Sequence, residues 1–408
     1  MEFNASRHHL PRFRLSTAAD LCVETVSVAS DTTNLGVLEL FTERRELMSL
    51  PVLENQRPIG LISRNIFLSQ MSKPYYHELY GKKSCIAFMD KDPLIVDGAM
   101  SIEELTFRAV ESGEKALADG FIVSRQGGLA GVGFGLQLMN VVANMQAEKN
   151  RQIMHSITYA SVIQRSLLRP SELALAAAVP DAHLEWQPRD VVGGDFYHFA
   201  QYPQGWFGAI ADCTGHGVPG AFMTLITSSI LSQALAQLGP ADPAALLAEV
   251  SRGVKNMLGQ QDNNGVASAS NDGMDAGFIW YERASSTLHY AGARLSLYLL
   301  TPDAAAVQSI DGERMGVGYT DTPADYQWRN LSIPLAPGSL VLLTTDGLID
   351  QIGGSREIAY GKRRMRDAML AQRTATAAQA GAALLADFLA WQGEQPRRDD
   401  LTFFCFRT

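Results

Sequence analysis

The stretch after Pro170 constrains the fold most, because apolar runs of strand length follow one another there, separated by turns rich in glycine. Helical patterns interrupt them at residues 220–238, 243–258 and 375–391. The runs lie at residues 183–191, 194–199, 205–212, 275–282, 287–293, 295–300, 338–346 and 401–407. Eight strands of this kind predict two stacked antiparallel sheets with helices on their outer faces, an α+β sandwich.

The first third of the chain repeats a pattern in which an apolar run leads through a glycine-flanked turn into a helix. The copies lie at residues 58–71 and 129–142, and helical patterns at 35–47 and 101–114 precede them. Ser101 and Glu104 form a capping box at the start of the second helix. The repeat predicts that one strand–turn–helix pattern occurs twice in this part of the chain.

Residues 136–168 contain neither Pro nor Gly and predict a connecting helix, which we expect to end at Pro170. Its apolar seam changes phase by one residue halfway along. The seam residues are Leu138, Val142, Met145, Ile153, Ile157, Ala160 and Leu167. A parallel dimer helix and a helix packed on its own domains both fit this pattern. We therefore expect a regulatory pair at 20–142, a helical linker at 143–170 and a third domain at 171–408.

Composition narrows the class of protein. With 408 residues, 46% apolar side chains and 19% charged ones, the chain is long enough for two or three globular domains. The net charge is −9, and we expect basic residues to be dispersed, so neither nucleic acid nor an anionic membrane is an expected partner. Residues 1–20 lack the apolar stretch of a signal peptide, and the four cysteines are too scattered for a metal or redox pair. A cytoplasmic location is expected.

Four aspartates recur at or beside the end of a predicted strand. They are Asp195 in VVGGDFY, Asp212 in AIADCTGHG, Asp346 in LLTTDG and Asp399 in RRDDLTFF. One such aspartate is more often a plain turn residue, but four of them bounding apolar runs indicate a site. Converging carboxylates repel one another unless cations bind, and oxygen ligands without paired cysteines favour Mg²⁺ or Mn²⁺ over zinc.

Two such metals could turn a bridging water into hydroxide at neutral pH and bind phosphoryl oxygens, so the pattern predicts phosphomonoester hydrolysis. His216 in DCTGHGVPG could donate a proton or orient a carboxylate, or it could only cap the helix that follows. Motifs of P-loop nucleotide hydrolases, dehydrogenases, serine hydrolases and kinases are missing from the sequence.

Six segments together resemble the metal-dependent serine/threonine protein phosphatases of type 2C, and in particular their bacterial branch of sporulation and sigma-factor regulators. The segments are RDVVGGDFY, ADCTGHGVPGAFM, DGMDAGF, LHYAGA, TTDGLID and RRDDLTFF. The resemblance implies a sandwich of two antiparallel sheets between helix pairs. It also implies two Mn²⁺ or Mg²⁺ ions surrounded by Asp195, Asp212, the backbone carbonyl of Cys213, Asp346 and Asp399.

The same resemblance assigns individual roles. Asp212 would bridge both metals, Asp346 and Asp399 would complete one, and Asp195 would hold the other, partly through water. Cys213 stands where relatives carry glycine. Asp400, Asp272 and Asp275 are expected to support the site or to lie near an additional weak metal.

The N-terminal repeat resembles a tandem pair of cystathionine-β-synthase-type modules, the CBS domains, which often bind adenine nucleotides in their cleft. Ser63 stands where such modules place the hydroxyl that meets phosphate, whereas Ile66 replaces the aspartate that meets ribose. Adenine nucleotide binding at Ser63 is one expectation, and a sensor that dimerises or binds protein is the other.

The resulting prediction is a metal-dependent phosphoserine and phosphothreonine phosphatase in a bacterial signalling switch, acting through metal-bound hydroxide. The N-terminal pair would control it through the connecting helix. The expected substrate is a phosphorylated protein such as an anti-sigma-factor antagonist, and a homodimer is expected. The alternatives are a catalytically inactive binding module on the same fold and a small-molecule phosphatase.

Overall fold

The computed structural model describes residues 17–260 and 270–408. The stretch 259–275 is polar and rich in glycine, and its first part is predicted to be a loop. Most of that first part lies outside the described residues, as does most of the N-terminal segment used to exclude a signal peptide. The chain divides into two compact units, one ending at Ile153 and the other comprising Met154–Thr408. The division falls inside one helix, α6 (Gly135–Ala178).

The N-terminal unit contains one topology twice. In each copy, a short strand pairs in parallel with a second strand, which pairs antiparallel with a third. The first sheet comprises β1 (Val28–Ala29), β2 (Ser49–Glu54) and β3 (Arg57–Ser63), and the second comprises β4 (Ile95–Asp97), β5 (Phe121–Arg125) and β6 (Gly128–Gly133). The helices are α1 (Asn34–Glu43), α2 (Arg64–Met71), α3 (Tyr76–Tyr80), α4 (Ile102–Glu111) and α5 (Glu114–Asp119). The repeated topology follows the repeat seen in the sequence.

Helix α6 continues through Pro170 and ends at Ala178, so the expected end before this proline is wrong. Proline lacks the N–H that would bond four residues back, which costs the helix about 3 kcal/mol. Apolar burial on both sides of Pro170 offsets that cost, because Leu168 and Leu175 both lie in the core of the C-terminal unit. The predicted seam residues Leu138, Val142 and Met145 pack in the core of the N-terminal unit. Near the other end of the helix, Leu168 is buried whereas the predicted seam residue Leu167 is 48% exposed, so there the packed face differs from the predicted one.

The C-terminal unit is the expected sandwich of two antiparallel sheets. One sheet has the order β14-β11-β10-β9-β8, and the other has the order β13-β12-β15-β18-β7. The strands are β7 (Ala182–Gln187), β8 (Asp195–Gln201), β9 (Gly205–Cys213), β10 (Met274–Glu282), β11 (Thr287–Ala293), β12 (Leu297–Leu300), β13 (Gln308–Ile310), β14 (Leu331–Pro334), β15 (Leu340–Thr344) and β18 (Leu401–Arg407). All eight predicted strands are present, and β13 and β14 add to them.

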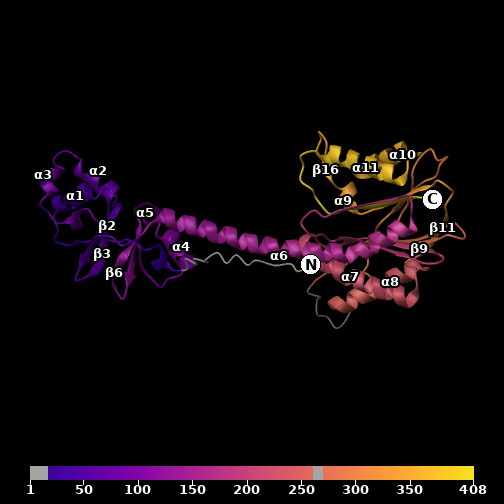
Figure 1. The fold of residues 1–408 in the computed structure, drawn as a ribbon, viewed down its shortest axis with the longest axis horizontal. Coiled ribbons are helices and arrows are strands. Elements are labelled where there is room, and N and C mark those ends of the chain that lie inside the picture. The colour runs from indigo at the N-terminus through magenta and orange to yellow at the C-terminus, as the bar shows by residue number, and fades with distance from the viewer. Residues whose placement is uncertain (1–16, 261–269) are drawn as a thin grey trace, which may run out of the picture. The chain divides into compact units, whose positions relative to one another are not determined.

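Helices cover both outer faces, with α7 and α8 on one side and α10 and α11 on the other (Figure 1). Strand β18 shows why both faces are apolar: Phe404 and Phe406 enter the inner core, whereas Phe403 and Cys405 pack under α10 and α11. The bounds are α7 (Gly217–Leu238), α8 (Pro243–Leu258), α9 (Asp346–Ile349), α10 (Gly361–Ala371) and α11 (Ala377–Gln392), with a small hairpin of β16 (Ile352–Gly353) and β17 (Ile358–Ala359).

Two helices differ from the sequence expectation. Helix α7 begins at Gly217, three residues earlier than predicted, so Pro219 lies in its first turn, where the missing N–H costs nothing. This helix is long and apolar enough to span a membrane, but it packs on β8 and β9. Helix α10 was not predicted, because four of its eleven residues are Lys or Arg and only one apolar face, with Met365 and Met369, is buried.

Candidate metal-binding and catalytic site

The four strand-end aspartates converge at one end of the sandwich. Asp195 opens β8 and faces Asp212 of β9 in the antiparallel register. Asp346 opens α9 directly after β15, and Asp399 precedes β18, the neighbour of β15 in the other sheet. The charges of Asp195, Asp346 and Asp399 all raise the pKa of Asp212, so both sheets contribute to one cluster.

Burial strongly disfavours the charged form of Asp195 and Asp212. Asp195 is only 1% exposed, and burial together with the nearby Asp400 raises its pKa well above the ordinary range. Its Oδ2 accepts a hydrogen bond of 2.8 Å from Thr345 Oγ1, but its buried Oδ1 has no partner among the described residues. Burial and the neighbouring aspartates likewise raise the pKa of Asp212. An unpartnered buried carboxylate oxygen indicates a missing cation.

The pKa of Asp346 is also raised by its surroundings. Burial and the charge of Asp399 raise its pKa, whereas a hydrogen bond with Asp212 lowers it. Among residues 17–260 and 270–408, no three Asp, Glu, His or Cys side chains already form a complete ligand group. The fit to a cation rests on donor chemistry instead, since carboxylate oxygens are ligands that Mg²⁺ and Mn²⁺ prefer. The donor set therefore fits Mg²⁺ or Mn²⁺.

Asp400 orients the loop before Asp195. Its two carboxylate oxygens accept hydrogen bonds from the N–H groups of Arg189 (2.6 Å) and Gly194 (2.5 Å). A Cβ on Gly193 would lie 2.7 Å from Asp400 Oδ2, so only glycine fits there. Asp400 thus acts on the cluster through the glycine loop.

Gln164 of α6 holds the same loop from the other side, and the sequence analysis missed it. Its side-chain amide donates to Gly193 O (2.7 Å) and accepts from Gly193 N (3.2 Å), and it also donates to Thr224 Oγ1 (3.1 Å). Gln164 is buried, at 4% exposure. The sequence carries no clear signal for it, because a glutamine in a long helix is ordinarily a solvent-facing residue. Through Gln164, α6 is tied directly to the residues that position Asp195.

Cys213 places its thiol away from the carboxylates. Its Sγ lies 3.4 Å from Thr227 Oγ1 of α7, and burial raises the pKa of the thiol. Its N–H donates to Gly194 O at 3.1 Å. Since side chains alternate along β9, a role for this residue at the cluster falls to its backbone carbonyl.

His216 lies at the N-cap of α7, and its Nδ1 is 2.9 Å from Asp190 Oδ2. The carboxylate accepts the Nδ1–H, which selects the tautomer with Nε2 as the free ring nitrogen. Both side chains are nearly half exposed. Asp190 was not anticipated as its partner.

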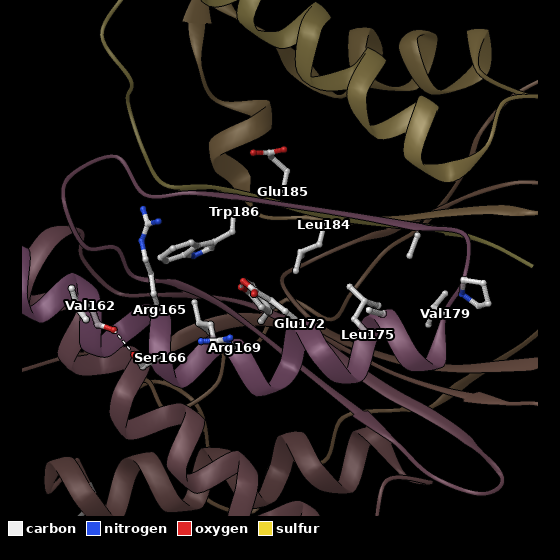
Figure 2. Close-up of a pocket in the computed structure, with 15 residues that line it drawn as sticks. Val162, Arg165, Ser166, Arg169, Glu172, Leu175, Val179, Leu184, Glu185 and Trp186 are labelled. Carbon is white, nitrogen blue, oxygen red and sulfur yellow. Dashed lines mark hydrogen bonds between the residues drawn. The ribbon is translucent and has the colours of Figure 1, made fainter. Parts of the chain in front are cut away.

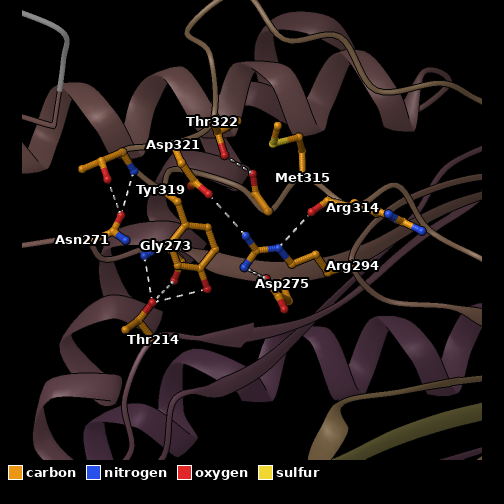
Figure 3. A network of polar contacts seen from close by, with 12 residues as sticks. Thr214, Asn271, Gly273, Asp275, Arg294, Arg314, Met315, Tyr319, Asp321 and Thr322 are labelled. Atoms are coloured by element: carbon orange, nitrogen blue, oxygen red, sulfur yellow. Dashed lines mark hydrogen bonds and ion pairs between the residues drawn. The ribbon is translucent and has the colours of Figure 1, made fainter.

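Asp275 and Asp272, which the sequence grouped together, have different surroundings. Asp275 faces Asp212 in the register of β9 and β10. Burial raises the pKa of Asp275 to about 6 despite the lowering effect of Arg294, whose Nη1 lies 3.4 Å from its Oδ1. Arg294 also stacks over the ring of Tyr319 (Figure 3). The backbone of Asp272 exchanges two hydrogen bonds with the side chain of Gln260.

A cavity of about 860 Å³ lies behind the cluster, between the C-terminal part of α6 and β7 (Figure 2). Tyr197 donates a hydrogen bond of 2.7 Å to Glu172 inside it. Trp186, which also lines it, donates its Nε1–H to Asp195 O at 2.9 Å. None of the four strand-end aspartates lines this cavity.

In the N-terminal unit, Ser63 donates a hydrogen bond of 2.6 Å to Asp119. Both residues line a cavity of about 240 Å³, at whose wall Lys115 and Asp90 form an ion pair of 3.5 Å. Ser63 therefore borders a cavity, but its hydroxyl is already engaged by a carboxylate.

Comparison with known proteins gives a consistent result. The family model described as Stage II sporulation protein E (SpoIIE) matches residues 203–408. The SiaA-PP2C domain of Pseudomonas aeruginosa is 37% identical, and the match covers 64% of this chain and 99% of that domain with a TM-score of 0.57. The comparison with curated proteins gave no match.

Two further solved structures match at lower similarity. The PP2C phosphatase domain of SpoIIE from Bacillus subtilis, with a fragment of its regulatory domain, is 15% identical, with coverage of 56% of this chain and 62% of that one and a TM-score of 0.44. The PPM Ser-Thr phosphatase MsPP from Mycobacterium smegmatis is 13% identical, with coverage of 56% and 99% and a TM-score of 0.38. On the family match and the SiaA-PP2C likeness, the chain belongs to the SpoIIE family and carries a serine phosphatase domain of the PP2C type.

Proposed function

We propose that this chain is a metal-dependent phosphatase that removes phosphate from Ser or Thr of a protein substrate in a bacterial signalling switch. The observation that carries the proposal is the convergence of the strand-end aspartates, because burial and the charges of neighbouring carboxylates raise the pKa of Asp195, Asp212 and Asp346. A protein gains nothing structurally from several buried carboxylates that repel one another. Two divalent cations would neutralise them.

Each residue has a defined task in this proposal. When bound, two Mn²⁺ or Mg²⁺ ions supply an activated water and positive charge for the phosphoryl oxygens. Asp212 near the end of β9 would serve both ions. Asp195 and the Cys213 carbonyl would hold one, and Asp346 and Asp399 would hold the other. His216, oriented by Asp190, would hold or donate a proton at Nε2.

The central experiment measures Mn²⁺-dependent hydrolysis of an aryl phosphate and of phosphoserine proteins by the unchanged chain and by Asp346→Asn. Asp303→Asn is the matched control, since Asp303 is exposed on a loop outside the cluster. We expect Asp346→Asn to lose activity and Asp303→Asn to keep it. Equal rates for all three proteins would refute the catalytic assignment and favour an inactive binding module. Hydrolysis of the aryl phosphate alone would favour a small-molecule phosphatase.

Control by the N-terminal unit through α6 is part of the proposal. The hydrogen bonds of Gln164 to Gly193 support it, because any shift of this helix acts on the loop before Asp195. The test compares the full chain with a chain lacking residues 1–135, in the presence and absence of candidate ligands. Unchanged activity and unchanged ligand response would refute control by this unit.

The proposal also covers the oligomeric state, the substrate and a regulatory ligand. We propose a cytoplasmic homodimer, supported by apolar side chains on α6 that are exposed in the single chain, such as Tyr159 at 65% and Val162 at 55%. The substrate would be a phosphorylated switch protein such as an anti-sigma-factor antagonist. A CBS-type regulatory pair could bind adenine nucleotide beside Ser63, and titration with ATP and AMP tests this directly.

A further inference from the structure

The segment around α10 is strongly basic in an otherwise acidic protein. Residues 356–373 carry six Lys or Arg and two Asp or Glu, a net charge of +4, whereas the whole chain carries −9. The expectation of dispersed basic residues is therefore wrong here. We call the exposed group Arg356, Lys362, Arg363 and Arg364 the basic ridge.

The positive charges of the basic ridge lower the stability of α10, the helix that carries three of its residues. Lys362, Arg363 and Arg364 lie in the first turn of α10, and that turn contains no acidic residue. The N-terminus of a helix carries a partial positive charge, so each cation there costs about 0.3–1 kcal/mol. A local conflict of this kind is typical of a functional surface.

The contacts of these side chains leave the ridge open to solvent. The side chain of Arg363 is 92% exposed, and its ion pair with Asp367 is long, at 3.9 Å. Arg364 stacks over the ring of Trp391 at 3.8 Å, which fixes its guanidinium beside α11. The basic ridge is thus a solvent-exposed, positively charged surface.

The ridge is linked to the carboxylate cluster by Gln351, which is fully buried just after α9. Its backbone carbonyl accepts from Tyr360 N (2.8 Å), immediately before α10. Its side chain accepts from Arg398 N (3.0 Å), the residue before Asp399. Helices α9, α10 and α11 lie on the same face of the sandwich (Figure 1). The start of α10 therefore lies next to the loop that carries Asp399.

We propose that the basic ridge is a docking surface for acidic side chains of the phosphoprotein substrate. This inference rests on the proposed phosphatase function. A protein with a charge of −9 repels an acidic partner at long range, and a local positive surface beside the catalytic end reverses this where the substrate must bind. The ridge would raise the association rate of acidic substrates and leave the chemistry at the cluster unchanged.

The experiment uses the full chain with Mn²⁺ and two synthetic phosphoserine peptides, one flanked by Glu and Asp and one by Ser and Gly. Binding is measured by fluorescence anisotropy and turnover by phosphate release. We expect the acidic peptide to bind about tenfold more tightly at low salt, and this preference to vanish near 1 M salt, where the Debye length is about 3 Å.

Charge reversal then assigns the preference to the ridge. We expect Arg363→Glu, and more strongly Lys362→Glu combined with Arg363→Glu, to abolish the preference while hydrolysis of an aryl phosphate is unchanged. The melting temperature should stay equal or rise, because the reversal suits the helix N-terminus. Arg283→Glu is the matched control, since it makes the same charge change in the turn after β10, at the other end of that strand from Asp275.

Three results would overturn the proposal: equal binding of both peptides, the same effect from Arg283→Glu as from Arg363→Glu, or parallel loss of aryl phosphate hydrolysis in the ridge variants. Tighter binding of a DNA oligonucleotide or an anionic vesicle than of the acidic peptide would also overturn it. Failure of the proposed function looks different, as lack of Mn²⁺-dependent aryl phosphate hydrolysis by the unchanged chain. Peptide binding remains measurable in that case.

Discussion

In the N-terminal unit, Asp119 accepts a hydrogen bond from Ser63, and Asp90 forms an ion pair with Lys115. In the C-terminal unit, Asp195, Asp212 and Asp346 have other carboxylates as their main neighbours, and burial raises the pKa of all three. A paired carboxylate contributes to the fold, whereas a buried carboxylate beside others destabilises it until a cation binds. The contrast separates aspartates that contribute to the fold from those that we propose to bind metal.

Asp195→Asn should have the largest effect. It removes a ligand at the centre of the cluster, so we expect activity to fall by at least about a thousandfold. In the metal-free protein the same change removes a buried charge, and the free energy of unfolding at pH 8 should stay equal or increase. Steady-state kinetics and urea unfolding measure the two effects. A clear loss of stability without metal would mean that Asp195 is mainly structural.

Gln164→Ala should have the second-largest effect. It leaves the N–H and C=O of Gly193 without their partner, which costs about 1–3 kcal/mol of stability. Activity and metal affinity should fall by about 10–100-fold, as is usual for residues that support a metal ligand. Gln152→Ala, on an exposed part of the same helix, is the control. Equal effects of the two substitutions would argue against a specific role for Gln164.

Metal removal should make stability depend on pH with a defined sign. The raised pKa values mean that the folded, metal-free protein binds more protons than the unfolded chain above about pH 4, so stability falls as pH rises. For Asp275, whose pKa burial raises to about 6, that loss lies between about pH 4 and 6. We expect a lower melting temperature at pH 8 than at pH 5 without metal.

Mn²⁺ at a hundredfold excess over its Kd should restore about 2.7 kcal/mol at pH 8. Differential scanning calorimetry with and without chelator measures both effects. The gain should disappear in Asp195→Asn. If the metal-free protein instead became more stable towards pH 8, the carboxylates would have to be paired in a way that this structure does not contain.

Ser63→Ala should have the smallest effect. It removes one hydrogen bond to a half-buried partner, and we expect a loss of about 0.5–1.5 kcal/mol with unchanged basal phosphatase activity. Chemical unfolding followed by circular dichroism measures the change. A larger effect on activity than on stability would place a functional site in the N-terminal unit as well and weaken the contrast.

Most of the sandwich was predictable because its strands are short and strongly apolar, with both faces of a strand such as β18 buried. Proline positions and helix propensity predicted the helices less reliably. Tertiary packing carries α6 through Pro170, and α10 forms despite its unfavourable N-terminal charges because Met365 and Met369 are buried beneath it.

The candidate site likewise contains residues that the sequence predicted and residues that it did not. The four aspartates were predictable, since each stands beside a strand-like run of the chain. Gln164 and the partner of His216 were not, because Gln164 lies 29 residues from Gly193 and Asp190 lies 26 residues from His216. Contacts over such separations leave no periodic trace in the sequence.

The sequence by itself determined the strand-rich C-terminal sandwich, the N-terminal repeat and the aspartates, because these depend on local patterns of apolar and turn residues. Only the tertiary structure decided that the carboxylates are buried next to one another, that Gln164 bonds α6 to the loop before Asp195, and that Gln351 links the start of α10 to the residue before Asp399. Electrostatic energy depends on distance in space and on burial, and neither quantity is encoded by spacing along the chain.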